Sequence, residues 1–388
     1  MASSMPLRPN NVYDQATIDT FSWMRFPLIV GVVLAHCNLV ALLEAWYGTV
    51  PTLPTWATFL FEQAYIYIFP ARVPTLFFIS GYFFFRGSQH YNKEFYARKY
   101  KRRIHSLLIP YVLWNAIALL LIYIRHTAQI HSNITESTPT IFDYLSGFWD
   151  FSFNRGFTAN APLWFMRDLI VVSLCAPLLR YILQGKWWVL SLPLIAIVHL
   201  ANVDIPISGF NAQAFFYFSI GATLAIHKTD ATRIPHPIGI ACLLLYIPAS
   251  YFLLKLHDQL WYTSASTIAI FIKTTACIYA VAQLFKRKVL SPTPILTQNS
   301  FFVFAFHGIV IGPVIKMLYI LASSNNPYIL LCIFIVAPTI TITSAFAARY
   351  ILLRYLPRLG NLLSGNRQAF PQSNISTAAF TFHIRGKD

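Results

Sequence analysis

Residues 21–43 read FSWMRFPLIVGVVLAHCNLVALL, an apolar run long enough to cross a membrane as one helix. Two ionisable side chains, Arg25 and His36, interrupt this run eleven residues apart. On a helix that spacing is about three turns, so the two side chains would share one face about 16 Å apart. Because ionisable groups inside a membrane usually face a bundle interior or a wet cavity, the pair predicts a polar path into the bilayer. The alternative is that Arg25 reaches the interface and His36 bonds a neighbouring helix.

The composition of the whole chain is that of a polytopic membrane protein. Only 11% of its 388 residues are charged and 56% are hydrophobic, whereas soluble domains carry roughly 25% charged residues. The first twenty residues are polar, and no cleavable signal peptide is expected. The net charge of +16 would point to nucleic acid in a soluble protein, but in a membrane protein the positive-inside rule explains it better. We therefore expect membrane lipids, and no nucleic acid, as partners.

We predict an all-α transmembrane bundle of about ten spans with both termini in the cytoplasm. With this orientation the external segments hold only Arg125, Arg155 and Lys255 of the 29 Lys and Arg, as the positive-inside rule requires. The predicted spans are 21–43, 59–86, 106–124, 163–183, 187–200, 212–227, 238–255, 264–285, 300–322 and 328–353.

The spans define three regions of the chain. Residues 1–20 would form a cytoplasmic segment, 21–356 the membrane domain and 357–388 a cytoplasmic tail. No separate soluble domain is long enough to fold alone.

A second intramembrane charge, Arg72, lies between Pro70 and Pro74. Two prolines so close together break or kink a helix, and a broken helix tolerates polar groups. Arg72 could therefore bind an anionic group, such as a phosphate or a developing oxyanion, or it could be a structural partner of Glu62 or Asp168. Gly81, further along this span, is expected to permit close helix packing.

A basic segment, Arg98–Arg103, precedes the third span. Basic clusters beside a span commonly bind anionic lipid headgroups and fix the topology. The charges of Lys101, Arg102 and Arg103 could also gather an anionic cytosolic donor such as a nucleotide or coenzyme A. The sequence leaves both interpretations open.

Polar residues also occur at the fourth and ninth spans. Trp164 is typical of an interfacial aromatic belt. Arg167 and Asp168 are adjacent and do not share a helix face, so each is expected to have its own partner elsewhere. Asp168 could orient His36 and support its protonation. His307 lies in an aromatic stretch, where packing or a helix–helix hydrogen bond is expected.

Motifs of several other protein classes are missing from the sequence. There is no GxxxxGK[ST] of P-loop ATPases and no GxSxG elbow. The five cysteines lie in apolar runs without CxxC spacing, and HExxH is absent. No metal site is therefore expected.

Taken in order, these segments resemble the bacterial acyltransferase 3 family of integral membrane acyltransferases. The resemblance covers about residues 20–310. Its motifs are Arg25 and His36 as R-x10-H, Arg72 before Pro74–Tyr82, the basic segment running into Ile109–Tyr111, Pro162–Phe165, and Ser300–His307.

The resemblance implies a ten-helix enzyme of the bacterial inner membrane, of the type without a fused hydrolase-like domain. Its members move an acyl group, commonly acetyl, from cytosolic acyl-CoA to a sugar hydroxyl of a glycan or glycolipid, often at the outer face. No permanently bound cofactor is implied.

The resemblance also assigns roles to residues. His36 would be the general base or proton carrier, and Arg25 and Arg72 would bind donor phosphates or stabilise the oxyanion. Lys101, Arg102 and Arg103 would help to bind the donor, with Trp164, Asp168 and His307 in support. The competing hypothesis is a transporter or flippase for a glycan or lipid intermediate, which needs no cytosolic donor.

Overall fold

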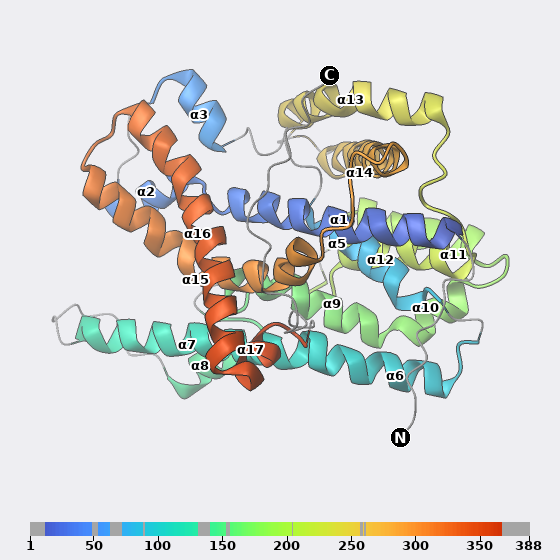
Figure 1. The fold of residues 1–388 in the computed structure, drawn as a ribbon, viewed down its shortest axis with the longest axis horizontal. Coiled ribbons are helices and arrows are strands. Elements are labelled where there is room, and N and C mark those ends of the chain that lie inside the picture. Colours follow the sequence, from blue (N-terminus) through green and yellow to red (C-terminus); the bar gives the residue numbers. More distant parts are fainter. Residues whose placement is uncertain are drawn as a thin grey trace, which may run out of the picture.

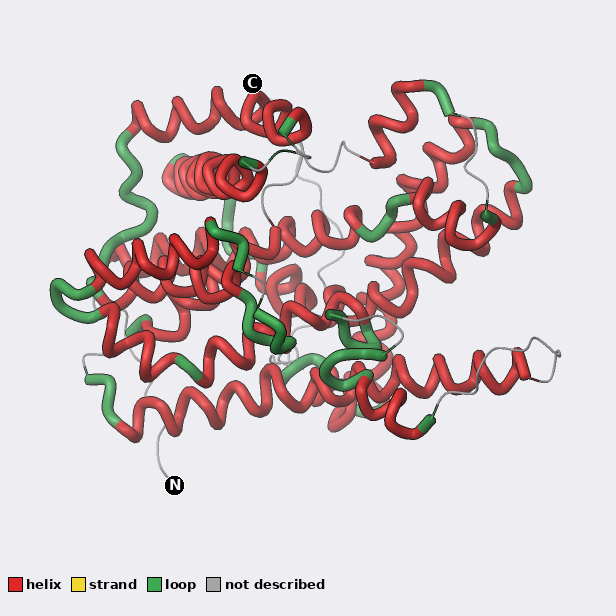
Figure 2. The backbone as a smooth tube through the Cα atoms, turned by 180° about the vertical axis from the view of Figure 1, so that it is seen from behind, coloured by secondary structure: helices red, strands yellow, loops and turns green. Residues whose placement is uncertain are grey.

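The structure is a computed structural model that describes residues 12–48, 53–62, 72–87, 90–130, 140–152, 156–203, 205–256, 259 and 261–366. Within these ranges every regular element is a helix and no strand occurs, as Figure 2 shows. The all-α prediction is confirmed.

The helices follow one another in the order drawn in Figure 1. Their bounds are α1 Val12–Ala35, α2 Leu39–Tyr47, α3 Thr55–Glu62, α5 Arg72–Phe85, α6 Lys93–Arg103, η1 Ile104–Leu108, α7 Ile109–Ile130, α8 Ile141–Ser146, η2 Ala161–Leu163, α9 Trp164–Leu174, α10 Ala176–Leu183, α11 Trp188–Leu200, α12 Ala212–Ile226, α13 His236–Lys255, α14 Tyr262–Lys286, α15 Pro294–Ala322, α16 Pro327–Tyr355 and α17 Pro357–Leu363.

Several of these helices are long and apolar enough to cross a membrane. Six described segments qualify, and the pair α9 and α10, which is bent by 59°, makes a seventh if it is one span. The helices α5, α11 and α12 are apolar but shorter. In Figure 1 α14 is seen end-on while α1 lies lengthwise, so the bundle is not a set of parallel rods. The chain is a multi-pass membrane protein; ten spans and the orientation stay predictions.

The first predicted span differs from its expected form. Residues 21–43 do not form one helix, because α1 ends at Ala35 and α2 begins at Leu39. The side chain of Asn38 accepts a hydrogen bond from the backbone N–H of Ala41 at 3.2 Å and so caps α2. Asparagine is among the best residues for starting a helix in this way. His36 consequently lies in a break between two helices and not on a continuous helical face.

Two glycines allow α5 and α12 to pack with their backbones in contact. A Cβ atom added at Gly81 would lie 2.1 Å from the carbonyl oxygen of Phe218, and one added at Gly221 would lie 1.9 Å from that of Phe78. Both distances are far below contact, so no side chain fits at either position. The expectation that Gly81 permits close packing is confirmed.

We expect Gly221→Ala to destabilise the protein, because the methyl group would force α5 and α12 apart. Overpacking of this kind costs about 1–3 kcal/mol. Thermal unfolding of the purified protein in detergent measures the effect. Gly312→Ala on α15 is the matched control, since its Cβ would meet only Trp46 at 4.0 Å. Equal melting temperatures for both variants would show that the glycine contact is not required.

The start of the predicted C-terminal tail is part of the packed bundle. The indole N–H of Trp114 on α7 donates to the carbonyl oxygen of Leu363 on α17 at 3.0 Å. The buried guanidinium of Arg349 on α16 donates to Ser364 Oγ and to Asn299 Oδ1, both at 3.1 Å. The helix α17 therefore closes one side of the bundle.

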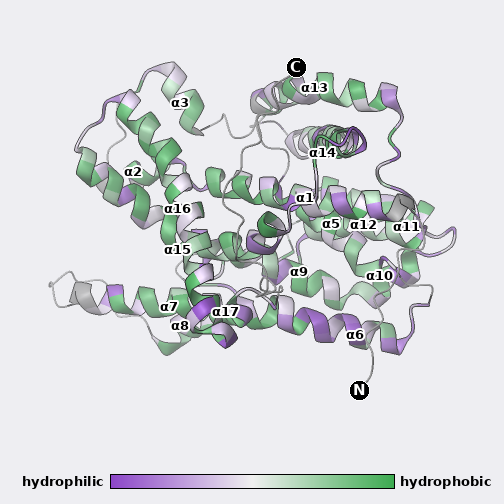
Figure 3. Ribbon diagram, viewed as in Figure 1, coloured by the Kyte–Doolittle hydropathy of each residue, from purple (hydrophilic) through white to green (hydrophobic). Residues whose placement is uncertain are grey.

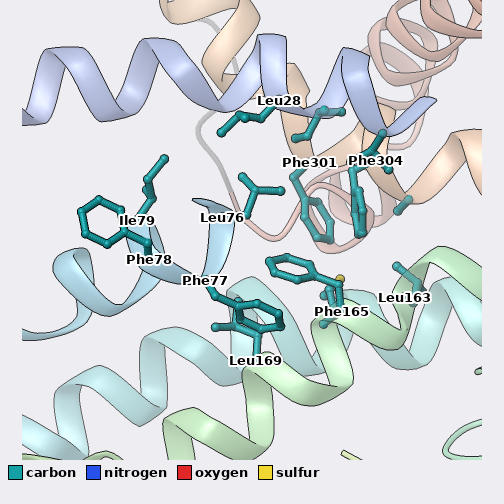
Figure 4. Close-up of a cluster of buried hydrophobic side chains, with 14 of the residues drawn as sticks. Leu28, Leu76, Phe77, Phe78, Ile79, Leu163, Phe165, Leu169, Phe301 and Phe304 are labelled. Atoms are coloured by element: carbon teal, nitrogen blue, oxygen red, sulfur yellow. The ribbon is translucent and has the colours of Figure 1, made fainter. Parts of the chain in front are cut away.

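An aromatic cluster joins α5, α9 and α15 in the core (Figure 4). The ring of Phe165 lies with its centroid 4.6 Å from that of Phe77 and 5.8 Å from that of Phe304. Phe304 in turn lies 5.8 Å from the ring of His307. Because protein interiors are close-packed, this cluster fixes the position of His307 on α15.

Candidate active site

The two histidines of the candidate site meet although 271 positions separate them in the chain. The ring centroids of His36 and His307 are 5.0 Å apart, in an edge-to-face arrangement. His36 is exposed, whereas His307 is fully buried behind it. Because of the break between α1 and α2, the accessible imidazole of His36 packs against the buried imidazole of His307.

Hydrogen bonding determines which nitrogen of His36 can act as a base. Nδ1 of His36 lies 2.8 Å from the carbonyl oxygen of Val32. Since a carbonyl oxygen only accepts, Nδ1 carries the proton in the neutral ring. Nε2 is then the acceptor nitrogen, and its lone pair can take a proton from a substrate hydroxyl.

A buried polar atom beside this pair, Oδ1 of Asn160, lacks a hydrogen-bond partner among the described residues. The Nδ2 atom of Asn160 donates to the carbonyl oxygen of Ala305 at 2.9 Å, which holds Asn160 against α15. Buried polar groups are nearly always satisfied, so unsatisfied ones point to a polar ligand or water. The expected helix–helix hydrogen bond of His307 is not found; the ring packs against His36 and Phe304 instead.

Arg72, the first residue of α5, is bonded to α1 close to the position that holds His36. Its Nη1 atom donates to the carbonyl oxygen of Gly31 on α1 at 2.9 Å. Gly31 adjoins Val32, whose carbonyl oxygen holds Nδ1 of His36, so Arg72 and His36 are bonded to neighbouring residues of α1. Arg72 thus places a guanidinium charge on this part of α1.

The buried acid predicted to support His36 has another partner. Asp168 Oδ1 accepts a hydrogen bond from Nε of Arg167 at 3.0 Å, and both side chains are buried. The two neighbours pair with each other because the long Arg167 side chain folds back onto the adjacent carboxylate. Each also has the separate partner that was predicted: Nη1 of Arg167 donates to the carbonyl oxygen of Trp149 at 2.7 Å, and the side chain of Asn211 bonds Asp168. Neither Asp168 nor the half-buried Trp164 hydrogen-bonds His36 within the described chain.

Arg25 belongs to a different cluster. It lies about 15 Å along α1 from Ala35, the residue at which α1 ends just before His36. Its guanidinium lies 4.5 Å above the ring of Phe83. The guanidinium of Arg103 lies 4.7 Å above the ring of Phe84 and donates to Ser173 Oγ at 2.5 Å. Lys99 Nζ donates to the carbonyl oxygen of Phe83 at 3.0 Å. We call Arg25, Lys99 and Arg103 the inner cation cluster.

The inner cation cluster has no acidic partner in the described part of the chain, where the ion pairs are Arg167–Asp168 and Arg233–Asp230. All three side chains are half-buried. Three positive charges on aromatic rings, without an acidic partner among the described residues, are complementary to a polyanion.

The basic segment divides between two faces of α6, the polar helix in Figure 3. Lys99 and Arg103 are one helical turn apart and point inward, while Lys101 and Arg102 are exposed. The donor-binding residues predicted from the sequence in this segment are Lys101, Arg102 and Arg103, without Lys99. The i, i+4 spacing of Lys99 and Arg103 was the signal that separates the two faces.

Comparison with known families decides the class of enzyme. Residues 18–348 match the family model of an acyltransferase domain, acyltransferase 3. The chain belongs to the acyltransferase 3 family. It is therefore a membrane acyltransferase, and the resemblance seen in the sequence is confirmed.

The chain is also distantly similar to a named protein. The acyltransferase is 24% identical over 360 residues to the succinoglycan biosynthesis protein ExoH of Rhizobium meliloti (strain 1021), which covers 89% of this chain and 91% of that protein. No solved structure matches the chain.

Proposed function

We propose that this acyltransferase moves an acyl group, in the simplest case acetyl, from cytosolic acyl-CoA to a sugar hydroxyl of an exported or cell-surface glycan, within the bacterial inner membrane. The observation that carries the proposal is the contact between His36 and His307, with Nε2 of His36 open and Arg72 bonded to α1 close to it. The name of the relative, which links it to succinoglycan biosynthesis, supports a polysaccharide acceptor.

The proposed chemistry is direct acyl transfer with His36 as the base. Nε2 of His36 takes the proton from the sugar hydroxyl while its oxygen attacks the thioester carbon. The carbon–sulfur bond then breaks, and the imidazolium returns the proton to the departing CoA thiolate. The positive charge of Arg72 stabilises the oxyanion that forms between these steps.

The inner cation cluster is the proposed site for the phosphates of the donor. Arg25 and His36 are both carried by α1 and the turn after it, so one rigid element sets the separation of the phosphate site and the base. An extended thioester arm would run along α1 between them. In the predicted orientation this cluster lies toward the cytoplasm, where acyl-CoA is available.

We expect neutralising the inward-facing pair to weaken donor binding more than neutralising the outward-facing pair. Charged hydrogen bonds contribute about 1.5–3 kcal/mol each, so Lys99→Gln with Arg103→Gln should lower acetyl-CoA affinity by roughly 100-fold or more. Lys101→Gln with Arg102→Gln is the matched control from the same helix. Its smaller effect should disappear at high salt, because exposed charges are screened.

Calorimetric titration of acetyl-CoA at low and high salt measures both variants. If the Lys101 and Arg102 variant loses as much affinity as the other, the donor binds on the exposed face of α6 and the assignment of the inner cluster is wrong.

The overall proposal is tested by incubating the purified protein in liposomes with radiolabelled acetyl-CoA and a glycan acceptor. Transfer of label to the glycan with release of CoA is the expected result. Movement of a glycolipid across the bilayer without CoA release would favour the transporter alternative.

A further inference from the structure

A large groove with positive charge lies between α2, α7 and α15. Its volume is about 820 Å³, and its polar lining comes from Trp46, Arg125 and Lys316. Lys316 Nζ lies 5.8 Å from the centre of the Trp46 ring. The proposed acyl transfer and donor binding do not involve these three residues.

Within the described residues, no acidic side chain neutralises the charges in the groove. No acidic side chain is among the described residues that line it, and neither Arg125 nor Lys316 forms an ion pair within the described chain. The other walls are apolar, including Met317, Ile320 and Leu321. Cations on an apolar membrane surface are costly unless an anion accompanies them. The groove is therefore complementary to a molecule with an anionic group attached to an apolar chain.

The groove and the inner cation cluster are far apart along one helical segment. Lys93–Thr127 is continuous and long enough to span, and it carries both Arg103 and Arg125. Their positions differ by 22 residues, which corresponds to about 33 Å, close to the roughly 30 Å thickness of the hydrocarbon core. In Figure 1 α6 and α7 lie in one line, with α2 on the side of α7.

Two of the helices that line the groove also lead to the histidine pair. The helix α2, which contributes Trp46, begins three residues after His36, and α15 carries both His307 and Lys316. His307 and Lys316 are nine positions apart, which corresponds to about 14 Å along the helix. A Cβ at Gly312, which lies between them, would meet only Trp46 at 4.0 Å, so the surface of α15 is open at this point.

We propose that this groove binds the acceptor as an anionic amphiphile, a sugar joined through phosphate to a membrane lipid. The phosphate lies between Arg125 and Lys316, the sugar extends past Trp46 toward His36, and the lipid chain lies along Met317, Ile320 and Leu321. This assignment rests on the proposed function, since it names the acceptor of the same reaction.

The test uses farnesyl phosphate as the probe, with farnesol and inorganic phosphate as comparison ligands. Binding to the purified full-length protein in detergent is measured without any acyl donor. Farnesyl phosphate is expected to bind at least tenfold more tightly than either comparison ligand, because only it satisfies both the cations and the apolar wall. Equal binding of farnesol would show that the cations do not contribute to affinity. Equal binding of inorganic phosphate would show that the apolar wall does not contribute. Either result overturns the proposal.

A variant pair locates the binding. Arg125→Gln with Lys316→Gln should lower farnesyl phosphate affinity about tenfold or more while leaving acetyl-CoA affinity unchanged, which also reports correct folding. Lys255→Gln is the matched control, because Lys255 is exposed and lies 5.7 Å from the ring of Tyr251. Unchanged affinity in the double variant would contradict the assignment. Acetyl-CoA binding is titrated separately. A wrong assignment of the groove would therefore change only the farnesyl phosphate results, and a wrong assignment of the donor would change only the acetyl-CoA results.

Discussion

Replacing His36 with alanine is expected to lower the rate of acyl transfer by about 10²–10⁴-fold, the usual contribution of a general base. The structure gives the reason, because Nδ1 is held by the carbonyl oxygen of Val32 and Nε2 is the nitrogen left to take a proton. Since His36 is exposed and lies in a turn, its removal leaves no buried cavity. Expression, melting temperature and acetyl-CoA affinity should therefore stay near those of the parent.

The control for this experiment is another histidine in the membrane domain. His199 is buried, stacks on Phe216 and lies 3.1 Å from Thr267 Oγ1 through Nε2. His199→Phe should change stability more than turnover. Full activity in His36→Ala would remove His36 from the mechanism, and equal losses in both variants would mean that activity reports only folding.

Arg72→Lys is expected to lower kcat by roughly 10²–10³-fold, the usual effect of removing an oxyanion donor. A lysine ammonium can replace the hydrogen bond to the carbonyl oxygen of Gly31, but it cannot also present the planar fork of a guanidinium. The effect should therefore be on kcat more than on acetyl-CoA affinity. Steady-state kinetics together with donor titration separate the two quantities.

Arg349→Lys provides the comparison for Arg72. Arg349 is buried and bound to Ser364 and Asn299, so its substitution should lower the melting temperature while the folded enzyme keeps its kcat. If Arg72→Lys binds the donor and turns over like the parent, Arg72 only connects α5 to α1.

Much of the fold could be predicted from the sequence because membrane helices have a strong compositional signal. A described helix overlaps each of the ten predicted segments. Six or seven of them are long enough to span by themselves. Whether short helices such as α11 and α12 cross the membrane depends on tilt and on packing against neighbours, which hydropathy does not encode.

The local geometry of the site could be predicted less well than the fold. The apolar run from Phe21 to Leu43 concealed the helix break, although Asn38 is a good capping residue in the right place. The pairing of Arg167 with Asp168 was missed because a rule about backbone spacing does not describe how a long flexible side chain folds back.

Long-range contacts also could not be predicted from the sequence. The contact of His36 with His307 joins the end of α1 to the middle of α15, and no periodicity relates two such positions. Asn160 was missed for the same reason, since its position just before Pro162–Phe165 gives no sign that it reaches Ala305. The roles of Arg25, His36 and Arg72 themselves came from the family motif and stay predictions.

The most direct test of the account is a sided transfer assay in liposomes that contain the purified enzyme in one known orientation. Radiolabelled acetyl-CoA is supplied to only one face and the glycan acceptor to only the other. We predict CoA release and labelled glycan when the donor meets the face that bears Lys99 and Arg103, and neither when the two substrates are exchanged. Equal turnover from both faces, or labelling only when donor and acceptor share a face, would contradict transfer through a centre at His36.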